Sequence, residues 1–182
     1  MKQLVIVRHA QRQNRADNSS HLSSEGIAMA QRVGASLGSF DLVATSTLPR
    51  AFETAIAMGF AVDQRLEDFH TQSDESAAEV TWYAGFAAWA EAYRRGAATT
   101  EFCDRVAAIC RDLIARVSEG GAVLVVSHGG VVEACAVALA PSADHAAWGE
   151  AAGYCEGVRL RFEAEHVVSA QTLRTDPANL AA

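Results

Sequence analysis

Two uninterrupted aliphatic runs, residues 4–7 and 122–126, constrain the fold of this chain more than any other feature. A strand with one solvent-facing side alternates apolar and polar residues, whereas a strand covered on both faces is apolar throughout. Each run is therefore expected to be a central strand with helices packed on both faces of its sheet. Each run also ends abruptly. Arg8-His9 follows the first run, and Ser127-His128 follows the second.

Helical periodicity separates these strands. Apolar residues recur every three or four positions from Ser24 to Leu37, in a helix that Gly38 is expected to end, and again from Phe102 to Val117. The other expected elements are a strand at 42–44, a helix at 49–58, a helix at 131–139 and a strand pair at 158–162 and 167–173. This alternation predicts an α/β fold, a single three-layer α/β/α domain over residues 1–182 with a mostly parallel central sheet.

The segment 63–96 is less regular, because it mixes acidic residues with large aromatic ones. The aromatic residues lie at helical spacing: Trp82, Tyr83, Phe86, Trp89 and Tyr93. This spacing predicts a helix whose aromatic stripe packs on the body of the domain. The stripe is either ordinary core or a partial cover over a ligand site.

Composition excludes several functional classes. The 182 residues carry a formal charge of −7 and contain no basic run, so neither nucleic acid nor an anionic membrane surface is expected as a partner. The apolar stretches are only strand-sized, and a strand is expected almost at the start, so neither a membrane span nor a signal peptide is predicted. We expect a cytoplasmic protein, whose oligomeric state the sequence leaves open. Its four cysteines lack CxxC spacing and are expected to be reduced core residues.

The strand ends predict the position of a ligand site. In open parallel sheets, ligands bind beyond the carboxyl ends of the strands, where Arg8, His9 and His128 are expected. Arg50 opens the helix that follows the strand at 42–44 and should reach the same edge. Guanidinium groups and helix N-termini both bind phosphoryl oxygens. The sequence therefore predicts a phosphate pocket, in which neighbouring positive charge would keep an imidazole neutral and nucleophilic.

Four segments resemble a known family. Arg8-His9-Ala10 resembles the RHG signature of the histidine phosphatase superfamily, which includes cofactor-dependent phosphoglycerate mutases and small phosphomonoesterases. The other three resemble its LTxxG, SPLxRAxxTA and VSHGG segments, at residues 22–26, 46–55 and 125–131. All four occur in the family's order and spacing, so the match is specific.

This resemblance implies a fold and a reaction. It implies a phosphoglycerate mutase-like fold in which His9 attacks phosphorus and becomes phosphohistidine, while Arg8, Arg50, His128 and Gly129 bind the phosphoryl group. The expected activity is metal-independent hydrolysis of a small phosphorylated substrate, a phosphomonoester, with no cofactor. The chain also contains no HExxH, P-loop or aspartate-rich metal motif.

The proton donor for the leaving group is less well defined. Family members usually carry a glutamate in an LxE segment, and Asp68 occupies that position in Leu66-Glu67-Asp68. Glu67 is the second candidate, and a donor elsewhere is the third. Alternatively, both carboxylates are solvated loop residues.

The loop after the first strand departs from the family pattern. Arg12 and Arg15 stand where Ser/Thr and Asn are common, and Asn14 would replace the family asparagine if the loop shifts by one residue. The two arginines either contact a second anionic group of the substrate or remain solvated.

Three alternative functions stay open. A phosphoglycerate mutase would return the phosphoryl group to its substrate, but such enzymes usually carry a larger insertion and a C-terminal tail, for which this chain has little room. A catalytically weak phosphate-ligand binding module is suggested by Ala10 and Thr47, which replace a glycine and a proline of the family motifs. A phosphatase of phosphohistidine proteins would suit the small size.

Overall fold

The computed structural model describes residues 1–175, so the end of the domain expected over residues 1–182 lies outside the described residues. The described chain forms a six-stranded sheet in the order β3-β2-β4-β1-β5-β6. The strands are β1 Lys2–Arg8, β2 Leu42–Ser46, β3 Gln64–Leu66, β4 Ala122–Ser127, β5 Gly157–Glu163 and β6 His166–Leu173. The sequence analysis did not predict β3, which is only three residues long and has no buried side chain.

The two aliphatic runs are adjacent central strands, as predicted. β1 and β4 pair in parallel, and β2 pairs in parallel with β4 and with β3. β5 runs antiparallel to β1, and β6 runs antiparallel to β5 at the edge. The predicted mostly parallel α/β fold is thus confirmed, with the antiparallel pair at one side.

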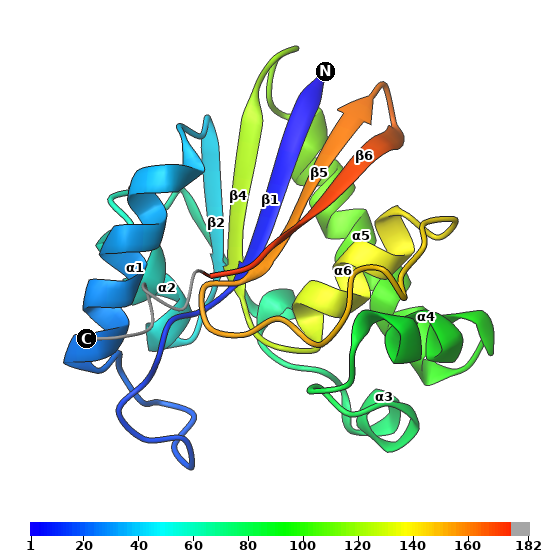
Figure 1. Ribbon diagram of the computed structural model, residues 1–182, viewed down its shortest axis with the longest axis horizontal. Helices are drawn as coiled ribbons and strands as arrows, with labels where there is room; N and C mark the ends of the chain where they lie inside the picture. The colour runs from blue at the N-terminus through cyan, green and yellow to red at the C-terminus, as the bar shows by residue number, and fades with distance from the viewer. Residues whose placement is uncertain (176–182) are drawn as a thin grey trace.

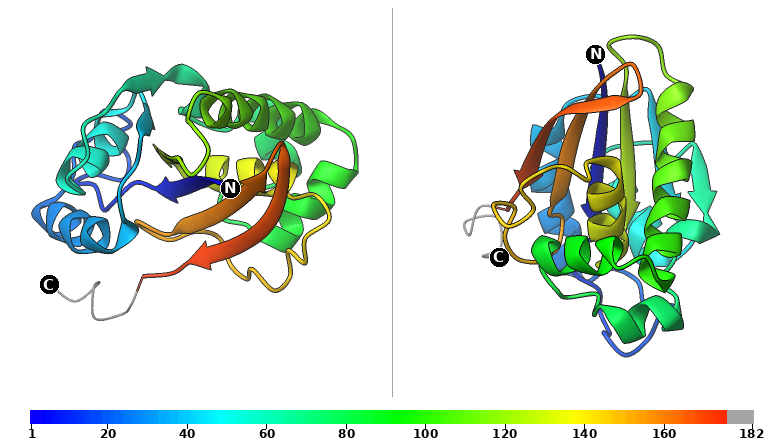
Figure 2. Two further views of the ribbon diagram at one scale, coloured as in Figure 1. Left: turned by 90° about the horizontal axis from the view of Figure 1, so that it is seen from above. Right: turned by 90° about the vertical axis from the view of Figure 1, so that its right-hand side faces the viewer.

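Helices cover both faces of the sheet (Figures 1 and 2). On one face, Val5 and Val7 of β1 pack in a cluster with residues of α1 (Ser24–Leu37) and α2 (Pro49–Ala57). On the other face, Leu4 packs with residues of α4 (Phe86–Arg94), α5 (Ala98–Ala115) and α6 (Val131–Leu139). Alternate side chains of one apolar strand thus enter two cores, which is why the run contains no polar residue. No helix among residues 1–175 is long and apolar enough to cross a membrane.

The middle segment differs from its prediction. The expected aromatic helix begins only at Phe86, and a separate short helix, α3 (Asp74–Glu79), precedes it. Phe86 and Trp89 are fully buried, whereas Trp82 is 47% exposed and lies in the connection between the two helices. The prediction was wrong for Trp82 and Tyr83, because residues that happen to fit a helical spacing can also line a loop.

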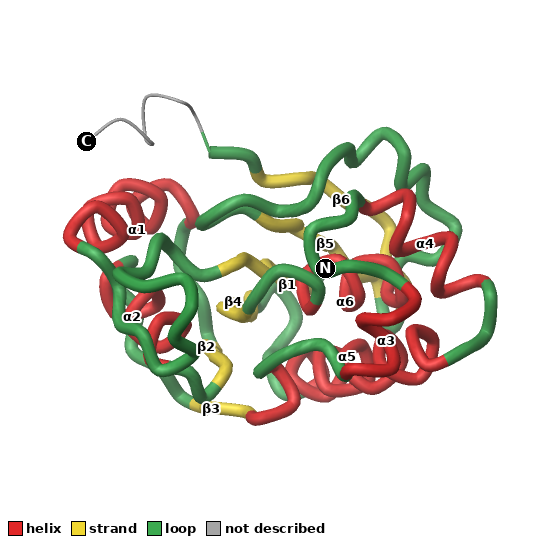
Figure 3. Tube along the Cα trace, turned by 90° about the horizontal axis from the view of Figure 1, so that it is seen from below, coloured by secondary structure: helices red, strands yellow, loops and turns green. Residues whose placement is uncertain are grey.

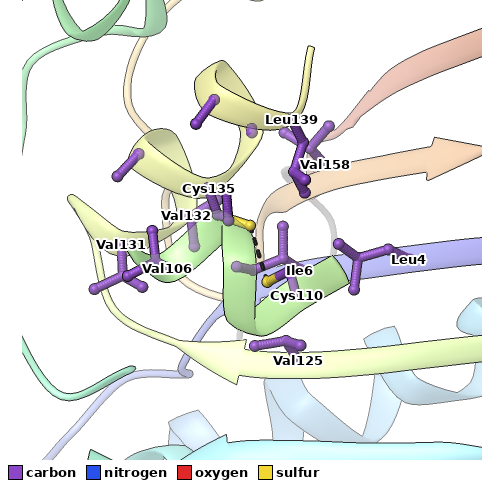
Figure 4. Close-up of a cluster of buried hydrophobic side chains, with 14 of the residues drawn as sticks. Leu4, Ile6, Val106, Cys110, Val125, Val131, Val132, Cys135, Leu139 and Val158 are labelled. Atoms are coloured by element: carbon purple, nitrogen blue, oxygen red, sulfur yellow. Dashed lines mark hydrogen bonds between the residues drawn. The ribbon is translucent and has the colours of Figure 1, made fainter. Parts of the chain in front are cut away.

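The cysteines lie in the core. All four are free and buried. Cys110 of α5 and Cys135 of α6 lie with their sulfur atoms 3.0 Å apart among aliphatic side chains (Figure 4). Burial raises the pKa of the Cys135 thiol, so it stays protonated and packs as a small apolar group.

Candidate active site

The carboxyl ends of β1, β2 and β4 meet at the lower edge of the sheet in Figure 1, which Figure 3 views directly. A cavity of about 250 Å³ opens there. Its walls are formed by Arg8, His9, Arg12, Asn18, Arg50, Thr71, Gln72, Ala77, Trp82, His128 and Gly129. Three of these side chains are arginines and none is a carboxylate, so the cavity suits an anion.

His9 lies at this cavity with its proton position fixed by the backbone. Its Nδ1 lies 2.7 Å from the carbonyl oxygen of Ala10. A carbonyl oxygen can only accept a hydrogen bond, so Nδ1 carries the proton and Nε2 carries the lone pair. The Nε–H of Arg50 donates to that Nε2 across 3.2 Å. Thr54 holds the loop in place, because its hydroxyl oxygen accepts the N–H of Ala10 at 2.9 Å.

The environment of His9 keeps its imidazole neutral. Burial lowers its pKa well below the ordinary value of 6.5, and the charges of Arg50, Arg8 and Arg12 lower it further. The hydrogen bond to Ala10 acts in the opposite direction but does not reverse the shift. The structure therefore presents a neutral imidazole nitrogen in a positively charged cavity.

Arg50 and Arg8 are held by different means. Arg50 is 3% exposed and donates to the carbonyl of Asn18 at 2.6 Å, and burial, together with Arg12 and Arg8, lowers its pKa to about 10. The Arg8 guanidinium lies over the rings of Trp82 and Tyr154, with centroid distances of 5.0 and 4.7 Å. These cation–π contacts hold Arg8 beside His9 without neutralising its charge.

His128 extends from the end of β4 toward His9, with 5.1 Å between the ring centroids. Its Nε2 lies 2.6 Å from Oγ of Ser46, at the end of β2, and that oxygen accepts the N–H of Leu48. The tautomer of His128 decides which of the two donates in this hydrogen bond, and Nδ1 of His128 is buried without a hydrogen-bond partner among the described residues. Burial lowers the pKa of His128 well below its ordinary value, and nearby His9 and Arg50 act in the same direction.

The structure does not bring the two expected acids into this cavity. Glu67 and Asp68 lie in a short 3₁₀ turn, Glu67–Phe69, and line a neighbouring cavity with Thr47, His70, Thr71 and Arg105. Asp68 is about half exposed and lies 3.8 Å from Arg105. Thr71 lines both cavities, so the carboxylates lie beside the His9 cavity and not within it.

The three expected substrate contacts separate in the structure. Arg12 lines the cavity, with its terminal nitrogens donating to the carbonyls of Arg15 and Asp17. Arg15 lies over the Tyr154 ring at 5.6 Å. Asn14 is exposed, does not line the cavity, and accepts a hydrogen bond from the N–H of Ala16.

Several residues of the site were not predicted from sequence. Asn18, Thr71 and Gln72 line the cavity, and Ser46 and Tyr154 contact residues that do. Trp82 also lines it, and it belongs to the aromatic stripe for which a partial cover over a ligand site was one of the two interpretations. Ser46 belongs to the segment at residues 46–55 that resembles a family motif, so that motif could have identified it as a site residue. Tyr154 lies far along the chain in the connection before β5, and nothing in its local sequence distinguishes it from a core tyrosine. Among residues 1–175 there is no group of three or more His, Cys, Asp or Glu side chains that could hold a metal ion.

The sequence matches the histidine phosphatase superfamily (branch 1) over residues 4–173, so the chain belongs to that family. No curated protein matches it significantly. Phosphoserine phosphatase from Entamoeba histolytica, solved with 3-phosphoglyceric acid, is similar in fold at 18% identity, with a TM-score of 0.68 over 99% of this chain and 100% of that one. A mycobacterial glucosyl-3-phosphoglycerate phosphatase is 21% identical, with a TM-score of 0.67 over 97% and 100%. Phosphoglycerate mutase from Thermus thermophilus is 22% identical, with a TM-score of 0.60 over 96% and 99%.

Proposed function

We propose that this protein is a phosphatase that hydrolyses small phosphomonoesters through a phosphohistidine on His9. The observation that carries the proposal is the His9 ring, whose Nε2 has its lone pair free of a proton and lies 3.2 Å from a buried guanidinium. Family membership supports the same chemistry. A phosphoryl group bound by Arg50 would therefore lie next to that nitrogen.

In the first step, His9 Nε2 forms a bond to phosphorus as the bond to the ester oxygen breaks. The leaving oxygen takes a proton from an acid group of the protein and departs as an alcohol. In the second step, a water oxygen attacks phosphorus and gives its proton to that same group, the P–N bond breaks, and His9 is restored with inorganic phosphate as the product. Arg8 and Arg50 supply fixed positive charge for the phosphoryl oxygens in both transition states, so the proposal requires no metal ion.

The proton donor belongs to the same proposal. Asp68 and Glu67 line the cavity that adjoins the His9 cavity at Thr71. The oxygen that needs the proton is the ester oxygen bonded to phosphorus, so it lies at the His9 cavity whatever the size of the leaving group, and a proton from either carboxyl must reach it past Thr71. We expect Asp68→Asn to slow alkyl phosphates more than aryl phosphates, whose leaving groups need less protonation. Glu67→Gln is the matched comparison. Equal effects of the two variants would indicate that the proton donor is another group.

Trapping of the enzyme-bound phosphoryl group tests the proposal. Wild type and His9→Ala would be mixed with labelled aryl phosphate and quenched in acid or base, with EDTA present throughout. Label that is acid-labile, base-stable, released as phosphate and absent from His9→Ala is the expected result. Saturable vanadate binding without label or turnover would instead favour the phosphate-ligand binding module.

Substrate choice can be tested with compounds that the similar structures suggest. Phosphoserine, glucosyl-3-phosphoglycerate and 3-phosphoglycerate are suitable because the proteins of similar fold are phosphatases of the first two and a phosphoglycerate mutase. Hydrolysis should dominate, since half-exposed Trp82 lines the cavity and water can reach it. Efficient formation of 2-phosphoglycerate with catalytic bisphosphoglycerate would favour the mutase alternative.

A further inference from the structure

Glu133 is a fully buried carboxylate to which the proposed reaction gives no role. It lies in the first turn of α6 and is 0% exposed, although α6 is otherwise built from apolar residues. Burial raises the pKa of its carboxyl, because a charge is poorly solvated there. Such a group is tolerated only with compensating hydrogen bonds and charge, so its partners indicate what it does.

The two carboxylate oxygens of Glu133 connect two separate loops. Oε2 accepts the N–H of Gly130 at 2.7 Å, which is an ordinary contact for the third residue of a helix. Oε1 accepts the N–H of Ala152 at 2.7 Å, in the connection that precedes β5. Both oxygens therefore accept backbone hydrogen bonds, one from the loop that follows His128 and the other from the connection that precedes β5.

The second loop also holds Arg8. The carbonyl of Ala152 accepts a hydrogen bond from the guanidinium NH1 of Arg8 at 3.1 Å. Ala152 therefore contacts Glu133 through its N–H and Arg8 through its carbonyl. Glu133 and Arg8 also attract each other electrostatically, each favouring the charged form of the other. The Nε of Arg8 is buried without a hydrogen-bond partner among the described residues, which leaves the orientation of the side chain dependent on these contacts and on its two aromatic neighbours.

We propose that Glu133 is a positioning residue that fixes Arg8 and the His128 loop relative to one another for phosphoryl transfer. The inference rests on the proposed function, and it assigns to Glu133 no contact with substrate. Its carboxylate acts through the backbone of Ala152 on Arg8 and through Gly130 on the loop that carries His128. Fixed donors stabilise a transition state better than mobile ones, so the effect should be larger on catalysis than on ground-state binding.

Glu133→Gln tests this role, because an amide has a single carbonyl oxygen and must turn its NH2 toward one of the two backbone N–H groups. We expect kcat/KM for an aryl phosphate to fall about 10- to 100-fold, as for small displacements of catalytic groups. Affinity for vanadate, which adopts the five-coordinate geometry of the transition state, should fall more than affinity for inorganic phosphate. In an Arg8→Lys background the same substitution should have a much smaller effect, since the two residues act together.

Asp41→Asn is the matched control, because the Asp41 carboxylate also accepts a backbone N–H, that of Ala122, but at the amino ends of β2 and β4. It should lower the melting temperature and leave kcat/KM unchanged. Glu133→Asp, which keeps the charge but is shorter, is expected to lose an intermediate share of activity and replaces Glu133→Gln if that variant does not fold.

Two outcomes would overturn the role of Glu133. One is a Glu133→Gln variant that melts earlier but keeps wild-type kcat/KM and vanadate affinity, as expected for a helix cap alone. The other is full additivity with Arg8→Lys. A wild-type protein that neither turns over aryl phosphate nor forms phosphohistidine would instead refute the proposed function, and the positioning role with it.

Discussion

Arg50 donates its Nε–H to Nε2 of His9 across 3.2 Å, although both side chains are cationic when protonated and both are buried. The contact requires a neutral His9, because a protonated Nε2 could not accept it. The guanidinium thus keeps the attacking nitrogen unprotonated, and it must give up this hydrogen bond when a phosphoryl group binds, because the same lone pair attacks phosphorus.

Replacement of Arg50 should thus affect both binding and the state of His9. We expect Arg50→Ala to lower kcat/KM for an aryl phosphate by about 10²- to 10³-fold, the usual effect of removing one transition-state donor. It should also raise the pKa of His9, because a neighbouring positive charge is lost. Steady-state kinetics and NMR titration of the ring measure the two effects. Arg116→Ala, which removes an exposed arginine that bonds Gln64, should change neither.

Trp82 and Tyr83 are adjacent in the chain and exposed, but only Trp82 lines the cavity and lies over Arg8. We expect Trp82→Leu to lower kcat/KM about 5-fold, in line with the loss of one cation–π contact at a partly exposed site. Tyr83→Leu is the neighbouring control and should leave kcat/KM within error of wild type. Equal losses in the two variants would show that the connection between α3 and α4, and not the indole ring, is responsible.

Gly26, the glycine of the segment that resembles LTxxG, allows α1 to lie against the loop that follows His9. A Cβ at this position would lie 2.0 Å from the carbonyl oxygen of Gln11, which belongs to the backbone and cannot simply rotate away. We expect Gly26→Ala to reduce the free energy of unfolding by about 1–3 kcal/mol, as for overpacking in other proteins. Urea denaturation measures this loss, and Ser24→Ala, on the exposed side of the same helix turn, should cost far less.

The two buried histidines predict how stability changes with pH. Because the pKa values of His9 and His128 are lowered below 6.5 in the folded protein, the unfolded chain binds more protons than the native one as the pH falls below 6.5. The free energy of unfolding should therefore be unaffected by these groups above about pH 7.5 and should decrease as the pH falls from 6.5 toward their lowered values, by up to about 1.4 kcal/mol per pH unit for each.

Urea denaturation in phosphate-free buffer between pH 7.5 and pH 5.5 measures this slope. His128→Gln should reduce it, because one of the two contributions is removed. A slope that is unchanged in this variant would show that His128 is protonated equally in the folded and unfolded states.

The amino-acid pattern was sufficient to predict the architecture and the group of cationic side chains at one sheet edge. Continuous apolar runs of this length are typical of strands buried on both faces, and in a parallel sheet the residues after such strands, Arg8, His9 and His128, must meet at the same edge. Arg50 was placed there by the helix that Pro49 begins. These relationships follow from local pattern and from connection rules, which is why they could be predicted.

The packing of distant segments was needed to establish which other residues reach the site. The positions of Asp68 and Glu67 in an adjoining cavity, of Trp82 over Arg8, and of Ala152 between Arg8 and Glu133 depend on how irregular connections pack. The same spacing of aromatic residues predicted one helix where the chain forms a loop followed by a helix, because periodicity carries no information on contacts between distant segments. The buried Glu133 is compensated by amides of two loops far apart in sequence, and only their packing against each other brings those amides to one carboxylate.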